Sequence, residues 1–505
     1  MAGNKAENGE DGSLNMPLAM PPADAGWAEA FAEQAQHKPW LGAYGEMPPA
    51  LEAMACGPLK VEGRLPDGLN GVLRRILAMR HEIAGLRYHH WWDGDGMLAE
   101  FRIEGGQVTQ RARCIETTKL RVEREAGRAV LEQFGTRLPG LRRPLNLDDM
   151  NPANVNVLWH GGELLALSDY CSAWSIDPTT LQGLGPKTFS ADTAGAPFSA
   201  HPRTDADGVL WSIGYAPWRQ RLYIYAIGPD GRTQKTAALP IEQFGLVHDF
   251  IATQRWLVVP LTSTVWSADR DAEGRSILDC LQWREDIPVR VLIIDKSDLT
   301  IARCVELPAG MIYHYSNGYE DSDGTIRFHC CWFADSSFMH QTFRAVMYGE
   351  LALGRPPTQL VVTIPPQGAP RMEQVSGMGE LPRVDERFMS RQFSQVWLCA
   401  PGRSGPPGPP TLFGNSVWTR LSLDSGTSDS FDFGPNVIAE EPSFAPRPNG
   451  SAEGEGWLVG TAFDIARRRT VLHVFDAMHM ADGPIASAPL PYALPIGVHG
   501  NFHPL

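Results

Sequence analysis

The sequence predicts an all-β protein, and a β-propeller is favoured over an array of β-sandwiches. After about residue 58, short apolar and β-branched runs recur, separated by Asp-Gly and other turn signals. Strands and helices do not alternate over this region, which argues against parallel α/β architectures. No Pro/Gly/Ser-rich linker divides the body of the chain. No repeat of fixed period is visible, so these patterns alone do not give a number of blades.

The elements expected along the chain begin with a flexible N-terminal arm at residues 1–24. A helix is predicted over Ala25–Gln36, with Asp24 as its N-cap, and the remainder, 25–505, is predicted to be a single domain. The predicted strands are VLRRILAM, LLALS, VLWSIGYA, RLYIYAI, RWLVVPL, VRVLIID, TIRFHCCWF, LVVTI, SQVWLCA, GWLVGTAF and TVLHVFDA. Turns are predicted at 67–68, 93–96, 207–208, 229–231 and 323–324, and Pro401–Pro410 is predicted to be one surface loop.

Composition and charge exclude several classes of function. Hydrophobic residues make up 43% of the chain, which allows a large core, and the net charge of −14 argues against a nucleic-acid partner. The eight cysteines form no CxxC pair and indicate free thiols in a reducing compartment. Residues 1–15 show no secretory signal, and the longest apolar run, near Trp256–Pro260, is far too short to span a membrane. A cytoplasmic protein is predicted.

Four of the fourteen histidines lie in or at the ends of strand-like runs, although none forms a local metal-binding motif such as HxH or HExxH. They are His201, His248, His314 and His499. Their wide separation places each in a different blade. A propeller directs the start of every innermost strand to its axis, where such residues would converge. Taken singly, each histidine is better explained as a hydrogen-bonded structural residue than as a metal ligand.

A series of longer motifs resembles the carotenoid cleavage oxygenase superfamily, which includes apocarotenoid-cleaving and stilbene-cleaving enzymes and a retinoid isomerase. The motifs, in family order, are HHWWDGDGM (89–97), TKLRVEREAGR (118–128, matching a segment of the first blade), NPANVNVLWHGGELLAL (151–167), AHPRTD, VHDF, HYSNGYED, GELPRVDERF (379–388), EEPSFAPRP (440–448) and VHGNF. Nine motifs in the same order are far more specific than any one of them.

The resemblance implies a seven-bladed β-propeller with an axial iron site and a cap of loops and short helices over a substrate tunnel. The metal would be Fe(II), held by His201, His248, His314 and His499, with O₂ as co-substrate. Four neutral imidazoles suit a borderline first-row ion, and they leave two positions of an octahedron open. His499 would thereby hold the last strand in place.

The family also orients its metal-bound imidazoles with three glutamates. Glu380 and Glu441 fall at two of those positions, where the alternative is a pair of surface acids. At the third position this chain has Asp169. Its shorter carboxylate is expected to reach His248 only through a shift or a water molecule.

Two aligned positions bear on the substrate. Arg137 and Ser168 stand where stilbene-cleaving relatives hold a phenol between a tyrosine and a lysine, and neither residue reproduces that clamp. The expected reaction is therefore cleavage of an internal C=C bond of a carotenoid or apocarotenoid by O₂, which gives two carbonyl products. The alternative is a lignostilbene- or hydroxystilbene-cleaving dioxygenase. An isomerase built on the same site and a metal-free propeller that serves as a binding module remain open.

Aromatic segments near the motifs suit an apolar substrate tunnel or the core. They are Tyr88, Trp91 and Trp92, for which core packing is expected, and CCWFADSSFMH (330–340). The expected partner is an apolar polyene or stilbenoid, with peripheral membrane contact for its uptake. No obligate protein partner is inferred.

Overall fold

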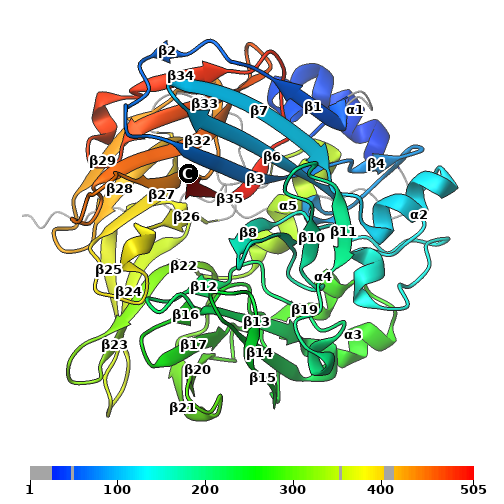
Figure 1. Ribbon diagram of the computed structural model, residues 1–505. Coiled ribbons are helices and arrows are strands. Elements are labelled where there is room, and N and C mark those ends of the chain that lie inside the picture. Colours follow the sequence, from blue (N-terminus) through cyan, green and yellow to red (C-terminus); the bar gives the residue numbers. More distant parts are fainter. Residues whose placement is uncertain (1–25, 47–50, 352–354, 403–414) are drawn as a thin grey trace, which may run out of the picture.

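Seven β-sheets stand as blades around a central axis in the computed structural model, which describes residues 26–46, 51–351, 355–402 and 415–505 (Figure 1). The expected all-β, seven-bladed architecture is confirmed. The expected arm at 1–24 and residues 403–410 of the expected loop lie outside the described residues.

Every blade begins with an innermost strand beside the axis, and its further strands follow outward. Blade 1 contains β35 (Gly497–Pro504), β3 (Gly71–Met79), β6 (Asp95–Glu104), β7 (Gln107–Cys114) and β1 (Ala53–Cys56). Blade 2 contains β8 (Asn156–His160), β9 (Glu163–Leu167), β10 (Trp174–Ile176) and β11 (Gly183–Pro186). Blade 3 contains β12 (Arg203–Thr204), β13 (Leu210–Ala216), β14 (Arg221–Ile227) and β15 (Thr233–Pro240). Blade 4 contains β16 (Ile251–Ala252), β17 (Trp256–Leu261), β20 (Val289–Asp295) and β21 (Ile301–Leu307).

Blades 5 to 7 continue the ring. Blade 5 contains β22 (Met311–Glu320), β23 (Ile326–Phe333), β24 (Thr358–Ile364) and β25 (Arg371–Met378). Blade 6 contains β26 (Glu380–Arg383), β27 (Gln395–Pro401), β28 (Asn415–Ser422) and β29 (Ser428–Asp432). In blade 7, β30 (Val437–Ala439) and β31 (Ser443–Pro446) both pair with β32 (Gly456–Asp464), which is followed by β33 (Arg469–Asp476), β34 (Ala486–Pro489) and β2 (Glu62–Gly63).

Burial explains why the predicted strands read as continuous apolar runs. A strand in the middle of a blade is covered on both faces by the neighbouring blades, so both sets of its side chains are buried. Every residue of β13 is buried, as are the last five of β17. The outermost strand β25, by contrast, has no buried residue. All eleven runs that were predicted as strands lie in the second or third strand of a blade.

Segments from both ends of the described chain close the ring. β35 pairs with β3 as the innermost strand of blade 1, and β2 pairs with β34 at the outer edge of blade 7. The buried guanidinium of Arg75 in β3 joins these blades, because it donates to the carbonyl oxygens of Glu441 and Val498. His499 is therefore held within a paired strand.

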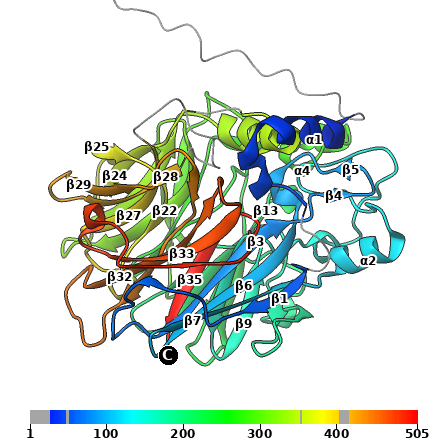
Figure 2. The ribbon, with the colours of Figure 1, turned by 90° about the horizontal axis from the view of Figure 1, so that it is seen from above.

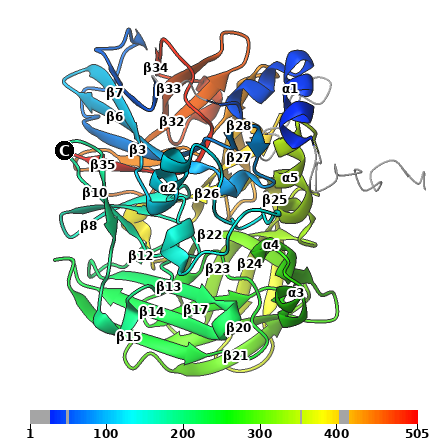
Figure 3. The same cartoon turned by 90° about the vertical axis from the view of Figure 1, so that its right-hand side faces the viewer.

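Helices and two small hairpins lie outside the blades. The helices are α1 (Trp27–His37), α2 (Thr118–Ala126), α3 (Ala268–Ala272), α4 (Ile277–Cys280) and α5 (Phe343–Ala345), and the hairpins are β4–β5 (Glu82–Ile83, Leu86–Arg87) and β18–β19 (Thr264–Trp266, Leu281–Trp283). Figures 2 and 3 show α1 and α4 on one face of the ring, with the end of β35 on the other. None of the helices within the described residues is long and apolar enough to cross a membrane.

Three local expectations were wrong. The first helix begins at Trp27 and is preceded by Gly26, whose φ of 82° is left-handed, so Asp24 is not its N-cap. Residues 93–96 do not form a hairpin turn, because Trp91–Asp93 is a 3₁₀ turn that leads directly into β6. The segment 118–128 is not part of the first blade: it forms α2, because Thr117 caps the Leu120 N–H and Gly127 ends the helix at a φ of 62°.

Candidate metal centre

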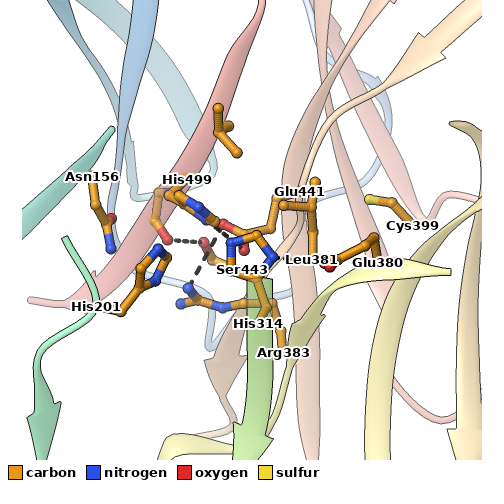
Figure 4. A network of polar contacts seen from close by, with 12 residues as sticks. Asn156, His201, His314, Glu380, Leu381, Arg383, Cys399, Glu441, Ser443 and His499 are labelled. Atoms are coloured by element: carbon orange, nitrogen blue, oxygen red, sulfur yellow. Dashed lines mark hydrogen bonds and ion pairs between the residues drawn. The ribbon is translucent and has the colours of Figure 1, made fainter. Parts of the chain in front are cut away.

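Four histidines from four blades meet at the axis. His201 and His248 immediately precede the innermost strands of blades 3 and 4, whereas His314 and His499 lie within β22 and β35. All four are buried, with at most 8% of their surface exposed. Figure 4 shows three of them turned toward one another. The expected convergence of the histidines is what the structure shows.

The ring nitrogens form a compact donor set. One nitrogen from each imidazole lies within 4.8 Å of the others, and the Nε2 atoms of His201 and His248 are 3.1 Å apart. The Nε2 atoms of His314 and His499 are buried and accept or donate no hydrogen bond within the described part of the chain. A buried polar atom left unpaired costs about 1–3 kcal/mol, so a ligand that engaged these two nitrogens would be favoured.

Three carboxylates orient three of the imidazoles. His248 Nδ1 lies 2.6 Å from Asp169 Oδ2, His314 Nδ1 lies 2.7 Å from Glu380 Oε2, and His499 Nδ1 lies 3.1 Å from Glu441 Oε1. An Nδ1–H that donates to a carboxylate leaves the lone pair on Nε2, which faces the cluster. Among the residues that the structure describes, only His201 of the four lacks such a carboxylate.

The contact of Asp169 corrects the expectation that this shorter carboxylate falls short of His248. The direct distance of 2.6 Å is the shortest of the three carboxylate–imidazole contacts. Asp169 lies just beyond the end of β9, and its backbone there stands close enough to the axis to offset the missing methylene group. Reach depends on where the strand ends as well as on side-chain length.

Burial and charge keep the cluster suited to a cation. Burial, together with the neighbouring imidazoles, lowers the pKa of His201 and His314 well below 6.5, so both rings are neutral near pH 7. Burial alone would raise the pKa of Glu441, but His499 and Arg383 outweigh it and lower that pKa to about 2. Burial lowers the pKa of His248, but Asp169 outweighs it and the pKa is raised, whereas burial raises the pKa of Glu380 to about 8. The centre therefore has neutral donors in His201 and His314 and an ionised carboxylate behind His499.

The residues present fit a first-row divalent ion. Neutral imidazole is a common ligand for iron, copper, nickel and zinc, and the set contains no thiolate or carboxylate that would favour another class of ion. The two unpaired Nε2 atoms are the donors that such an ion would satisfy. The four-histidine cluster is thus a candidate metal site on the propeller axis.

Two different environments meet at this cluster. On one side, a polar cavity of about 360 Å³ reaches His201, His314 and His499. His503 also lines this cavity, and the end of β35 that carries it lies on the face opposite α1 and α4 (Figures 2 and 3). On the other side, the Trp92 ring stacks on His248 with centroids 5.7 Å apart and an interplanar angle of 5°.

Aromatic rings extend from Trp92 away from the axis. Its ring lies 5.5 Å from Phe134, 6.4 Å from Tyr313 and 5.2 Å from Phe343, measured between centroids. A small cavity of about 20 Å³ lies among Trp92, Phe134 and Asp169. Apolar surroundings of this kind suit an apolar ligand.

Comparison with known proteins identifies the family. The model of the retinal pigment epithelial membrane protein family matches residues 48–504. The chain belongs to this family. It is 28% identical to the apocarotenoid-15,15'-oxygenase of Synechocystis over 488 residues, which cover 92% of this chain and 96% of that protein.

Solved structures of family members agree with the fold. The cobalt-substituted apocarotenoid oxygenase of Synechocystis superposes with a TM-score of 0.80 at 25% identity, covering 92% of this chain and 98% of that one. The lignostilbene dioxygenase of Pseudomonas brassicacearum gives 0.79 at 26% identity, with 90% and 96% covered. The protein is a dioxygenase of the carotenoid cleavage oxygenase group, to which relatives that act on polyenes and on stilbenes both belong.

The two positions singled out in the sequence as bearing on the substrate, Arg137 and Ser168, line different cavities. Arg137 pairs with Glu132 at 3.1 Å and lines a cavity of about 220 Å³. Ser168 is buried beside the metal centre, where its hydroxyl donates to Asn151 over 2.9 Å. Each side chain thus has a polar partner within the protein.

The aromatic residues singled out in the sequence have different roles in this oxygenase fold. Tyr88 is fully buried and donates to Glu123 at 2.7 Å, and Trp91 stacks on Phe343, so both pack the core as expected. Trp92 also packs against the core, as expected, but it is only partly buried and its ring stacks on His248 as well.

Sequence reasoning missed the charged residues around the centre. Arg203, Asp249 and Arg383 all line the polar cavity of about 360 Å³. A signal was present, because each follows a site residue by one to three positions, in AHPR, HD and ELPR. Residues at such spacing on an innermost strand stay near the axis.

Proposed function

We propose that this dioxygenase cleaves an internal C=C bond of an apocarotenoid-type polyene with O₂, adding one oxygen atom to each carbon to give two carbonyl fragments. The observation that carries the proposal is the set of four inward-facing imidazoles beside a wall of aromatic rings. Similarity to the apocarotenoid-15,15'-oxygenase of Synechocystis supports the choice of substrate.

The cofactor that we propose is Fe(II), held by His201, His248, His314 and His499. Bound there, ferrous iron would supply the redox chemistry that activates O₂. Asp169, Glu380 and Glu441 would hold three of the imidazoles in the tautomer that presents Nε2. Trp92 and its neighbours would exclude water and hold the polyene by apolar contact.

An apolar substrate agrees with the residues Arg137 and Ser168, which do not form a tyrosine–lysine clamp for a phenol. Buried apolar surface contributes on the order of 25 cal/mol per Å² before ordering costs, so a long polyene needs no charged anchor. The eight cysteines are unpaired, which supports a reducing compartment, and we infer a cytoplasmic protein on that ground.

A hydroxystilbene is the second candidate, because three buried phenols lie beside the aromatic wall. The hydroxyls of Tyr170 and Tyr215 face each other and that of Tyr313 faces the Met339 backbone, but none of these contacts has the geometry of a full hydrogen bond, and no other partner lies within the described residues. Tyr170 and Tyr215 pack with ring centroids 5.3 Å apart, and Tyr313 lies 5.8 Å from His248. A hydroxyl group on the substrate would satisfy such groups, each of which costs about 1–3 kcal/mol when unpaired.

The test is a panel of apocarotenals, carotenoids and hydroxystilbenes incubated aerobically with iron-loaded protein, with kcat/KM measured from the aldehydes released. We expect the highest values for the apocarotenals. Efficient cleavage of hydroxystilbenes without polyene cleavage would establish the second candidate instead. Isomerised polyene without aldehyde would indicate an isomerase. A purified protein that contains no iron, takes up none and turns over no substrate would indicate a binding module.

Tyr215→Phe separates the two substrate classes further. Removal of a hydroxyl that pairs with the substrate should lower kcat/KM for a hydroxystilbene by about tenfold, the usual scale of one hydrogen bond to a buried partner. The same change should leave kcat/KM for an apolar polyene within about twofold, since the ring remains in place.

A further inference from the structure

The polar cavity on the face opposite α1 and α4 has walls unlike those of the aromatic side. It reaches the centre from the end of the ring where β35 finishes (Figures 2 and 3). We infer that this axial channel is the route by which the metal ion enters and leaves, on the side of the centre away from the aromatic rings around Trp92. The inference rests on the metal site and is independent of the identity of the substrate.

The channel reaches the four-histidine cluster from the side opposite Trp92. His201, His314 and His499 line its inner end, whereas His248 is covered by Trp92 on the other side. A hydrated divalent ion that entered the channel would therefore meet three imidazole rings directly. Figure 4 shows these rings, with Arg383 in the wall beside them.

The charges in the channel wall favour a cation. Four carboxylates line it, from Asp205, Asp249, Glu386 and Glu441, together with two guanidinium groups. Both guanidinium groups are tied to acids: Arg203 lies 2.5 Å from Asp249, and Arg383 lies 2.9 Å from Glu386. The other two acids also have cationic neighbours, because Lys296 lies 3.1 Å from Asp205 and Arg383 lies 3.7 Å from Glu441. The four carboxylates still outnumber these three cations by one, and this excess of negative charge attracts metal ions.

The opposite side of the centre obstructs an ion. Among the residues that the structure describes, Trp92, Phe134 and Phe343 form consecutive aromatic contacts there. A divalent ion travels with a hydration shell, and these apolar rings offer no polar atoms to replace it. Removing that shell in apolar surroundings is prohibitively unfavourable.

The first test changes charge at the channel mouth and measures metal uptake without substrate. Glu386 is exposed there, so Glu386→Lys should slow the uptake of Co²⁺ by the metal-free protein by about tenfold at low ionic strength. The difference in uptake rate between the variant and the wild type should shrink at 1 M salt, where the screening length falls to about 3 Å. The final amount of bound Co²⁺ should equal that of the wild type, which shows that the site itself is intact.

The matched control makes the same charge change on the other face. Glu33 is an exposed residue of α1, and Glu33→Lys should leave the uptake rate within about twofold of the wild type. If Glu33→Lys slowed uptake as much as Glu386→Lys, net charge would explain the result and the channel would not be the route.

A second variant narrows the channel without changing its charge. Thr204 is exposed at the lining of the channel, and Thr204→Trp should slow both Co²⁺ uptake and its release to an external chelator by several-fold. Unchanged rates in both Thr204→Trp and Glu386→Lys would overturn the inference. Since Co²⁺ binding needs neither O₂ nor a polyene, this outcome would leave the proposed reaction untouched.

Discussion

His499 is the residue whose loss separates a metal ligand from a structural histidine most clearly. His499→Ala removes one of the four nitrogen donors, so bound iron should fall to a small fraction of the wild-type content and turnover should vanish. The measurements are iron per protein by elemental analysis and aldehyde release. His503→Ala is the control, because His503 lies on the same strand but outside the four-nitrogen cluster, and it should retain iron. Full iron content in His499→Ala would contradict the ligand set.

Asp169 should contribute as much to metal affinity as Glu380 and Glu441 do. Its direct contact with His248 means that Asp169→Asn removes an orienting carboxylate in the same way as Glu380→Gln and Glu441→Gln do. Each change should weaken metal affinity by about 10- to 100-fold, the scale typical for the loss of such a carboxylate. Competition with a chelator of known affinity measures this. An effect at Asp169 far smaller than at both glutamates would mean that His248 needs no carboxylate to orient it.

At the scale of elements, Gly497 tests how tightly β35 is fitted into blade 1. A Cβ atom added at Gly497 would lie 2.4 Å from the carbonyl oxygen of Ile76, which is backbone and cannot move aside. Gly497→Ala should therefore lower the free energy of unfolding by about 1–3 kcal/mol, the usual cost of overpacking. Urea denaturation measures it. Gly45→Ala is the matched control, because its nearest neighbour would lie 3.8 Å away, and its stability should stay near that of the wild type.

Some elements were predictable because their pattern is local. The middle strands of the blades read as apolar runs, and they are covered on both faces. Helix α2 also carries readable signals in Thr117 and Gly127, which the assignment of 118–128 to the first blade, by its match to the family motif, did not take into account. The reach of Asp169 could not be predicted, since it depends on where the backbone of blade 2 lies relative to that of blade 4.

At the scale of the whole molecule, a bound metal ion should cross-link the blades and stabilise the folded ring. The four histidines come from blades 1, 3, 4 and 5, so an ion bound by all of them stabilises the closed ring but not the unfolded chain. Free metal at 100 times its dissociation constant adds about 2.7 kcal/mol to the free energy of unfolding. Thermal unfolding with Co²⁺ and with chelator should show this as a higher Tm with metal. In His499→Ala, the Tm should no longer depend on Co²⁺. A metal-dependent rise in Tm equal to that of the wild type would contradict the cross-linking role of the metal.

The order of the ligands along the chain has a consequence for biosynthesis. His201, His248 and His314 emerge from the ribosome well before His499, which arrives with the strand that closes blade 1. A nascent chain that extends only to blade 6 holds three imidazoles in an open ring. The complete donor set can form only when β35 docks against β3, so acquisition of the proposed metal would be coupled to the last step of ring assembly. Translation that stops between these points would yield a chain whose partial site is open to whichever metal the cell presents.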